Sequence, residues 1–99
     1  MPYPLTLPKQ LRNRGWKVKI QDKERLEPPH VTVWHYGEVW RINLRTGEFM
    51  VPPGGNWTEI DPMVRQLIED EDNWRELCDA WDAMYPTNPI SSLEDEDDA

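Results

Sequence analysis

Residues 30–51 read HVTVWHYGEVWRINLRTGEFMV, and this segment carries the strongest indication of the fold. Two short turn sequences, Tyr36-Gly37 and Thr46-Gly47, divide it into three runs that read as β-strands. A glycine in a two-residue loop supplies the positive φ that a tight hairpin turn requires. We therefore predict three antiparallel strands that are joined by two hairpins.

The two turns predict registers that agree with each other. A turn at residues 36–37 pairs Val33 with Trp40, and one at residues 46–47 pairs Leu44 with Phe49 and Ile42 with Val51. Side chains alternate between the faces of a strand. Both registers therefore place the same apolar residues on the inner face: Val31, Val33, Trp40, Ile42, Leu44, Phe49 and Val51. The outer face carries His30, Thr32, Trp34, Val39, Arg41, Asn43, Arg45 and Met50.

The segments before this stretch predict a further strand and a short helix. Residues 16–20 alternate strictly between apolar and charged side chains, which predicts a strand with Trp16, Val18 and Ile20 pointing inward. Residues 6–14 predict a short helix that Thr6 caps and Gly15 ends. The prolines in residues 1–8 favour an extended arm ahead of this helix.

The segments after it predict two helices. Asp61 is a good N-cap and Pro62 suits the first helical position, and apolar residues then follow helical spacing. Asn73 and Glu76 resemble a capping box, so we predict helices at residues 62–70 and 74–85. The whole is an α+β fold: a three- to four-stranded antiparallel sheet with the C-terminal helices on one face and a short N-terminal helix. Residues 1–89 form one domain, and residues 90–99 form a disordered acidic tail.

The charge of the chain is divided between its halves. Residues 1–46 carry nine Lys and Arg against four acids, whereas residues 47–99 carry two against fifteen, giving a net charge of −8. This asymmetry indicates either an interaction surface or simply a solvated helix face and a solubilising tail. The single cysteine excludes an intramolecular disulfide, and no apolar run indicates a signal peptide or a membrane span. We expect a soluble cytoplasmic protein.

Three motifs resemble a widespread family of small bacterial domains of unknown function. They are EPPHVTV at residues 27–33, WRINLRTGE at residues 40–48, and an acidic, Trp-bearing helix from Asn73-Trp74 to Trp81. Members of that family typically read PPHVHV, and they are often encoded beside another small protein in toxin–antitoxin-like pairs. The resemblance spans about residues 17–85. It implies a small α+β fold and a protein partner, without an established chemistry. Thr32 stands where the family motif has its second histidine.

A second likeness is to small toxin ribonucleases with a double-stranded-RNA-binding-like fold, and it is one of element order alone. His30 is the weak catalytic candidate, as a general acid or base, with Thr32 and Arg41 on the same face. The alternative is a strand-start residue that is hydrogen-bonded to a loop. His30 and His35 point to opposite faces of one strand, so we expect no metal site. We also expect no cofactor, and we favour a non-enzymatic protein.

The outer sheet face is the candidate binding surface. It gathers cations around an aromatic side chain, which is typical of surfaces that follow phosphates and stack bases, although the negative net charge repels polyanions at long range. An acidic protein suits the same face. We hypothesise a protein-interaction protein, with RNA binding or cleavage as the alternative. The binding residues are Trp34, Arg41, Arg45, His30, Lys17 and Lys19. Trp34 and Trp57 are the two tryptophans that the predicted core does not require.

Overall fold

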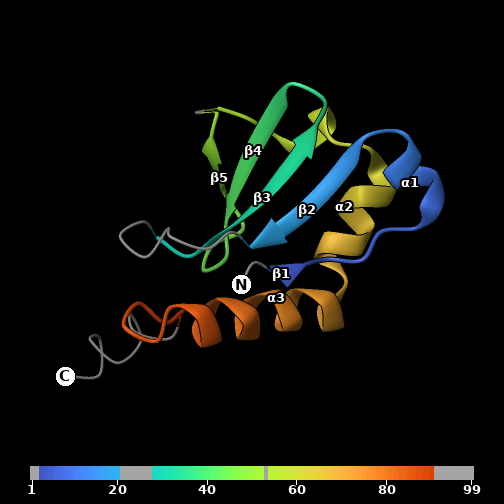
Figure 1. Cartoon of the computed structure of the whole chain (residues 1–99). Coiled ribbons are helices and arrows are strands. Elements are labelled where there is room, and N and C mark those ends of the chain that lie inside the picture. The colour runs from blue at the N-terminus through green and yellow to red at the C-terminus, as the bar shows by residue number, and fades with distance from the viewer. Residues whose placement is uncertain (1–2, 21–27, 53, 91–99) are drawn as a thin grey trace.

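The predicted α+β fold is observed, with five strands in the sheet rather than three or four. The computed structural model describes residues 3–20, 28–52 and 54–90. The strands lie in the sheet in chain order and each pairs antiparallel with the next (Figure 1). They are β1 (Tyr3–Pro4), β2 (Trp16–Ile20), β3 (His30–His35), β4 (Glu38–Asn43) and β5 (Phe49–Val51).

The additional strand β1 comes from the proline-rich N-terminal arm. Tyr3 pairs with Ile20 at the edge of β2, and the Leu5 N–H donates to the Val18 carbonyl at 2.9 Å. The arm is extended, as its prolines predict, and β2 supplies the hydrogen-bonding partners that make it a strand. The sequence did not predict this pairing because the helix at residues 9–13 separates the two segments along the chain.

The N-terminal helix α1 (Lys9–Asn13) is shorter than the predicted 6–14, and Thr6 does not cap it. Its N-cap is Pro8, which makes no side-chain cap hydrogen bond. The pairing of the arm with β2 holds the preceding residues extended, so the helix begins later. Gly15 ends the helical segment in the left-handed region with φ +89°, as predicted.

The hairpin of β3 and β4 has the predicted register throughout. Val33 pairs with Trp40, and His35 pairs with Glu38 on either side of the two-residue loop. The positive φ belongs to Tyr36 (φ 56°) rather than to Gly37, so the expected role of the glycine was wrong. The register was predictable because a two-residue loop and strict alternation both act locally.

The predicted register of the next hairpin is wrong. Ile42 pairs with Phe49 and Arg41 with Val51, with an irregularity between the two pairs. Asn43 explains the difference, because its Oδ1 accepts hydrogen bonds from the Arg45 and Thr46 N–H groups, at 2.7 and 3.1 Å. Its own N–H donates to the Glu48 carbonyl at 2.8 Å, which leaves residues 44–47 as a four-residue loop. Val51 therefore leaves the inner face and is 37% exposed.

The C-terminal helices are α2 (Pro62–Glu69) and α3 (Glu71–Met84). Asp61 caps α2 by accepting from the Met63 N–H at 2.9 Å, as predicted. The second helix begins earlier than the predicted residue 74, because Asp70 caps it by accepting from the Asn73 N–H at 3.1 Å. The Asn73 side chain instead donates to the Leu67 carbonyl at 2.8 Å and satisfies the end of α2. A single 3₁₀ turn, η1 (Trp57–Glu59), precedes α2.

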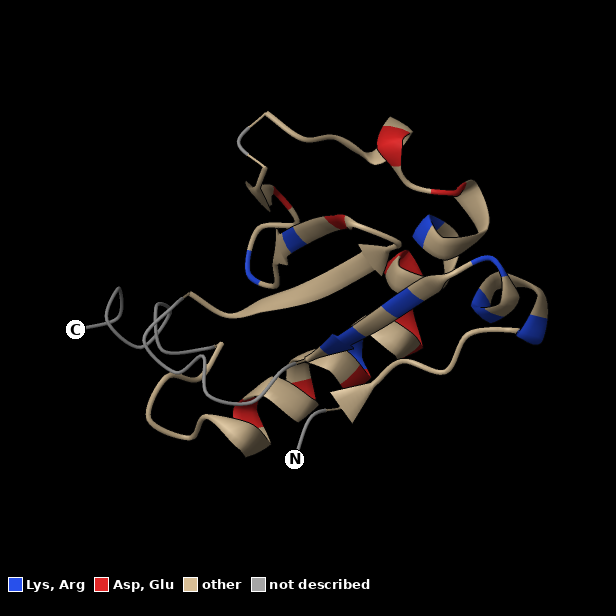
Figure 2. Ribbon diagram, turned by 45° about the horizontal axis from the view of Figure 1, so that its top comes forward, with Lys and Arg blue, Asp and Glu red and all other residues tan. Residues whose placement is uncertain are grey.

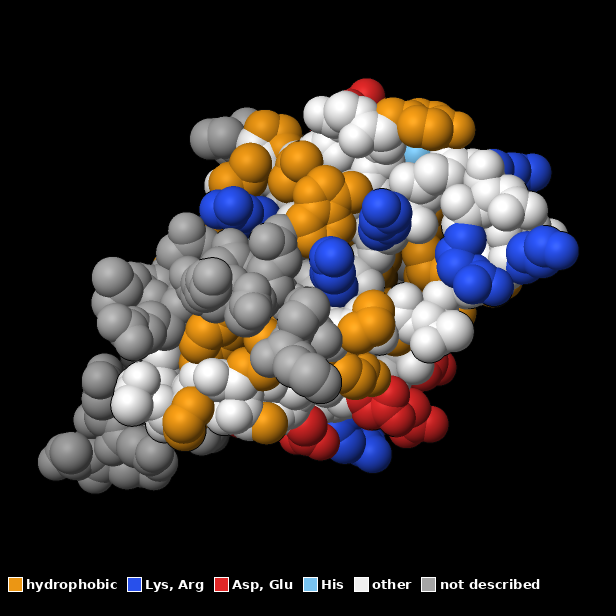
Figure 3. All heavy atoms as spheres, viewed as in Figure 1, with side chains coloured by type: hydrophobic (Ala, Val, Ile, Leu, Met, Phe, Trp, Pro, Cys, Tyr) orange, Lys and Arg blue, Asp and Glu red, His pale blue; other side chains and the backbone are white. Residues whose placement is uncertain are grey.

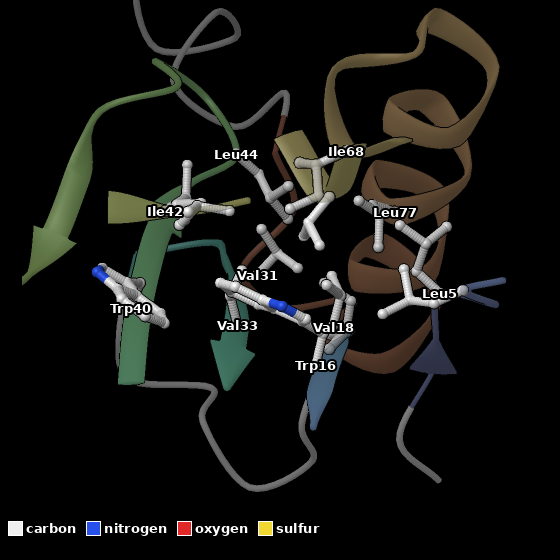
Figure 4. Packing of buried hydrophobic residues seen from close by; sticks show 14 of the residues in the cluster. Leu5, Trp16, Val18, Val31, Val33, Trp40, Ile42, Leu44, Ile68 and Leu77 are labelled. Carbon is white, nitrogen blue, oxygen red and sulfur yellow. The ribbon is translucent and has the colours of Figure 1, made fainter. Parts of the chain in front are cut away.

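The core lies between the sheet and these helices. Figure 4 shows side chains of β2, β3 and β4 meeting those of α2 and α3 around Val31, Ile68 and Leu77. Trp16, Trp40 and Trp81 are buried in it, and Trp74 packs at its margin. Among the described residues, no helix combines the length and the apolarity that crossing a bilayer would require. The predicted tail lies outside the described residues except for Ile90.

Candidate functional site

The outer face of the sheet divides into a covered end and an open end. Where β3 begins, His30 and Thr32 are each only 1% exposed. Where β3 ends, Lys17 and Lys19 of β2 and Trp34 of β3 line an open groove of about 480 Å³ with Gly15 and Tyr36. A ligand that binds the sheet face can therefore reach the second end and not the first.

The open groove places two cations beside an aromatic ring. Lys17 lies directly opposite Trp34 in the β2–β3 ladder, and the Lys19 ammonium lies 5.4 Å from the Trp34 ring centroid. This distance is within the range of a cation–π contact. Figure 3 shows Lys and Arg side chains gathered beside hydrophobic ones on this face. The groove thus combines positive charge with flat apolar surface.

Tyr36 projects from the hairpin loop at the rim of the groove and is 75% exposed. Its ring is the outer end of a row of aromatic rings. The His35 ring lies 4.5 Å away at a tilt of 44°, and His35 in turn stacks nearly parallel to Trp16 at 4.0 Å. Trp16 in turn lies 5.9 Å from Trp40 in the core. From the sequence, Tyr36 is expected only as a turn residue. A large aromatic in a two-residue loop is the signal that could have indicated it.

The two groove lysines also stand at the border of a second hollow. This hollow, of about 350 Å³, lies on the β1 side and is lined by Arg12 of α1, by the N-terminal arm and by β2. Basic side chains therefore continue from Arg12 across Lys17 and Lys19 to the Trp34 ring. Figure 2 shows this blue band on α1 and β2, whereas red acidic residues follow α3.

Arg41 lies on the same face but outside this groove. It pairs with Thr32 on one side and with Val51 on the other, and its side chain is half-buried. Thr32 also lies opposite Lys19, so two strand spacings, roughly 10 Å, separate Arg41 from Lys19. Arg41 therefore borders the groove region from β4 rather than lining it.

Arg45 has a different role from the one predicted. Its Nε donates to the Ile90 carbonyl at 3.0 Å, and a terminal nitrogen donates to the Pro89 carbonyl at 2.7 Å. The guanidinium thus fastens the segment after α3 to the β4–β5 loop. These donors are directed at the protein's own backbone, and Arg45 does not line the open groove.

His30 has the surroundings of the alternative interpretation, in which it is a strand-start residue that is hydrogen-bonded to a loop. Its Nδ1 donates to the Pro28 carbonyl at 2.9 Å, and its ring lies 5.4 Å from the buried Trp81 ring. The Thr32 hydroxyl is also buried, and it has no hydrogen-bond partner among the described residues. The sequence placed both with Arg41 as a conceivable RNA-cleaving set, but burial keeps both from a substrate on this face.

Cys78 and the possible metal ligands among the described residues were the remaining candidates for chemistry. Burial, with Asp82 and Asp79 nearby, raises the pKa of the Cys78 thiol to about 11, which leaves little nucleophilic thiolate at neutral pH. Within the described residues, no three His, Cys, Asp or Glu side chains gather as metal ligands would.

Comparison with known proteins gives no family on which to base a function. The family resemblance noted in the sequence therefore stays a hypothesis. No family model, no curated protein and no solved structure matches this chain.

Proposed function

We propose that this chain is a small non-enzymatic binding protein and that its open groove holds single-stranded nucleic acid. The observation that supports this is the placement of Lys17 and Lys19 beside Trp34, with Tyr36 at the rim. Sequence-tolerant single-strand binding combines a basic groove that follows the backbone with aromatic rings on which bases stack. Both components are present in one hollow.

The two aromatic side chains offer stacking surfaces of different kinds. Trp34 lies on the sheet face, with the Lys19 ammonium 5.4 Å from the centroid of its ring. Tyr36 is exposed at the loop but is supported from below by Gly15 and from the side by His35. A base that stacks on a ring whose orientation is already restricted loses less conformational entropy on binding.

The negative net charge does not cancel the local positive potential. The acids of α3 and the basic band occupy different parts of the surface (Figure 2). At physiological ionic strength, charges more than about 8 Å apart are largely screened from each other. A phosphate in the groove is therefore influenced mainly by Lys17, Lys19 and the nearby Arg12.

An acidic protein segment is the second candidate partner, as one member of a toxin–antitoxin-like pair. The exposure of Val39 and Val51 on the same face favours it, because these apolar side chains continue the surface beyond Trp34 toward β5. A folded partner could cover both the groove and these residues. Contacts with the two valines would add little to the affinity for a nucleic acid.

Fluorescence anisotropy with a short labelled single-stranded oligonucleotide tests the proposal. We expect binding at low salt that weakens with ionic strength, and a marked loss in the variant Lys17→Glu/Lys19→Glu. Each phosphate contact contributes about 0.7 to the slope of log K against log salt for single strands, so the double variant should lower that slope by roughly 1.4. Trp34→Ala should weaken binding about fivefold or more, because stacking on an aromatic ring contributes roughly 1–3 kcal/mol per base.

The matched control is Lys9→Glu/Arg75→Glu, which makes the same change in net charge at exposed positions outside the groove. An equal loss in this control would show that only total charge matters. A labelled polyglutamate peptide separates the two partner classes. If it binds through the lysines while no oligonucleotide binds at low salt, the acidic-protein candidate replaces the nucleic acid.

A further inference from the structure

A third hollow lies away from the basic groove and has the opposite electrostatic character. It has a volume of about 200 Å³ and is lined by Trp57 of η1, Trp74 of α3, Glu69 of α2 and Gly47 of the β4–β5 loop. Four segments of the chain therefore meet around two indole rings and a carboxylate.

The two rings leave space between them. Among the described residues, Trp57 and Trp74 make no ring contact with each other, although both line the cavity. The edge-on contact of Phe49 with Trp57, at 5.2 Å and 81°, restricts the Trp57 ring. Trp74 packs against the core from the first turns of α3. The rings are thus oriented by the fold before any ligand arrives.

The surroundings of this cavity favour positive charge. Glu69 begins a run of four acids, residues 69–72, at the junction of α2 and α3. One cation is already attracted to this region, because the Arg65 guanidinium lies 5.3 Å above the Trp57 ring and donates to Glu69 at 2.8 Å. Arg65 is not among the residues that line the cavity, so this contact leaves the cavity itself open.

We propose that the cavity formed by Trp57, Trp74 and Glu69 binds a methylated ammonium group. Aromatic faces attract cations that are short of hydrogen-bond donors, and quaternary ammonium groups are recognised in this way. The cavity is larger than the roughly 150 Å³ of an engineered cavity that accommodates benzene, so a tetramethylated nitrogen has room. The site is separate from the groove proposed above and does not depend on its function.

Tetramethylammonium chloride is the first probe, titrated into the full-length chain at constant ionic strength. Each of the six tryptophans contributes one indole N–H signal to the ¹H–¹⁵N spectrum. We expect the signals of Trp57 and Trp74 to shift in a saturable way, with the Trp34 signal unchanged. Glu69 is at an exposed position. Glu69→Gln removes one negative charge there and should weaken tetramethylammonium binding roughly two- to fivefold.

The neutral isostere tert-butyl alcohol is the decisive control, because it has nearly the same shape without the charge. Equal affinity for the alcohol, or no shift of either indole signal, would overturn the proposal. Arg65→Ala should tighten tetramethylammonium binding, because it frees Glu69 and removes the competing cation. Choline and a peptide carrying trimethyllysine then distinguish the sources of the methylated ammonium group. Tighter binding of choline indicates that the natural ligand is a small metabolite. Tighter binding of the peptide indicates a modified protein.

Discussion

The ring of Tyr36 lies against the backbone of Gly15, so closely that a Cβ at Gly15 would come within 2.6 Å of Cε1 of the tyrosine. This contact joins the end of α1 to the β3–β4 loop and supports the exposed aromatic at the rim of the basic groove. Two requirements therefore coincide at Gly15: a positive φ, and the absence of a side chain.

Gly15→Ala should destabilise the fold and displace Tyr36. The left-handed conformation alone costs a non-glycine residue roughly 1–2 kcal/mol, and the clash with the ring adds to it. Urea unfolding measures the loss. Gly47→Ala is the control, because Gly47 has a similar φ of +77° but open space around the position of its Cβ. In a Tyr36→Ala background the excess cost at Gly15 should disappear; a cost that persists there would show that the ring contact contributes nothing.

Arg45→Ala should release the segment after α3 without weakening ligand binding in the groove. The variant loses the hydrogen bonds to the Pro89 and Ile90 carbonyls, and hydrogen bonds to charged groups contribute about 1.5–3 kcal/mol each at most. We expect faster amide hydrogen exchange at Ile90 and a lower unfolding midpoint. Lys17→Ala should do the opposite: weaker oligonucleotide binding and unchanged stability. A reversed pattern would restore Arg45 to the binding surface.

Removal of residues 91–99 should strengthen the binding of an anionic ligand. The deletion removes five carboxylates and changes the net charge from −8 to −3. We expect a gain of several-fold at low salt that vanishes at high salt, because long-range repulsion is screened. Anisotropy titrations of both chains at two ionic strengths measure it. Equal affinities at low salt would mean that the tail has no electrostatic effect on the groove.

The stability of the fold should decline in alkaline solution through Cys78. Its pKa is raised from 9.0 to about 11, mainly by burial and further by Asp82 and Asp79. The stabilisation from keeping the thiol protonated is complete below pH 9 and is lost as the pH rises to about 11. Because the Cys78 side chain is only half-buried, we expect the free energy of unfolding to fall by less than about 2 kcal/mol over this pH range.

The Cys78→Ser variant isolates this effect from the lysines and tyrosines that titrate in the same range. The difference in unfolding free energy between wild type and variant should narrow as the pH rises from 8 to 11. The native thiol should also react with iodoacetamide at pH 8 about a hundredfold more slowly than the unfolded chain, in proportion to its thiolate fraction. Equal reaction rates would contradict the raised pKa.

Features that depend on residues close together in the chain were predictable from the amino-acid sequence. The alternation of Trp16–Ile20 predicted β2 and its inward side chains, and the loop at Tyr36-Gly37 predicted the β3–β4 register. Asp61 and Pro62 predicted the start of α2. The local prediction failed at Asn43, where a side chain closed a longer loop than the glycine pattern indicated.

Which surfaces are open depends on contacts between residues that are far apart in the sequence. His30 is buried because it meets Trp81, Arg45 is engaged because it meets Pro89 and Ile90, and β1 exists because Leu5 meets Val18. Each partner lies far along the chain or beyond an intervening helix, so no local pattern contains it. The sequence assigned His30, Trp34 and Arg45 to one outer face, and packing left only Trp34 available there. Burial and hydrogen bonding depend on what the rest of the chain places nearby, and periodicity alone does not contain that information.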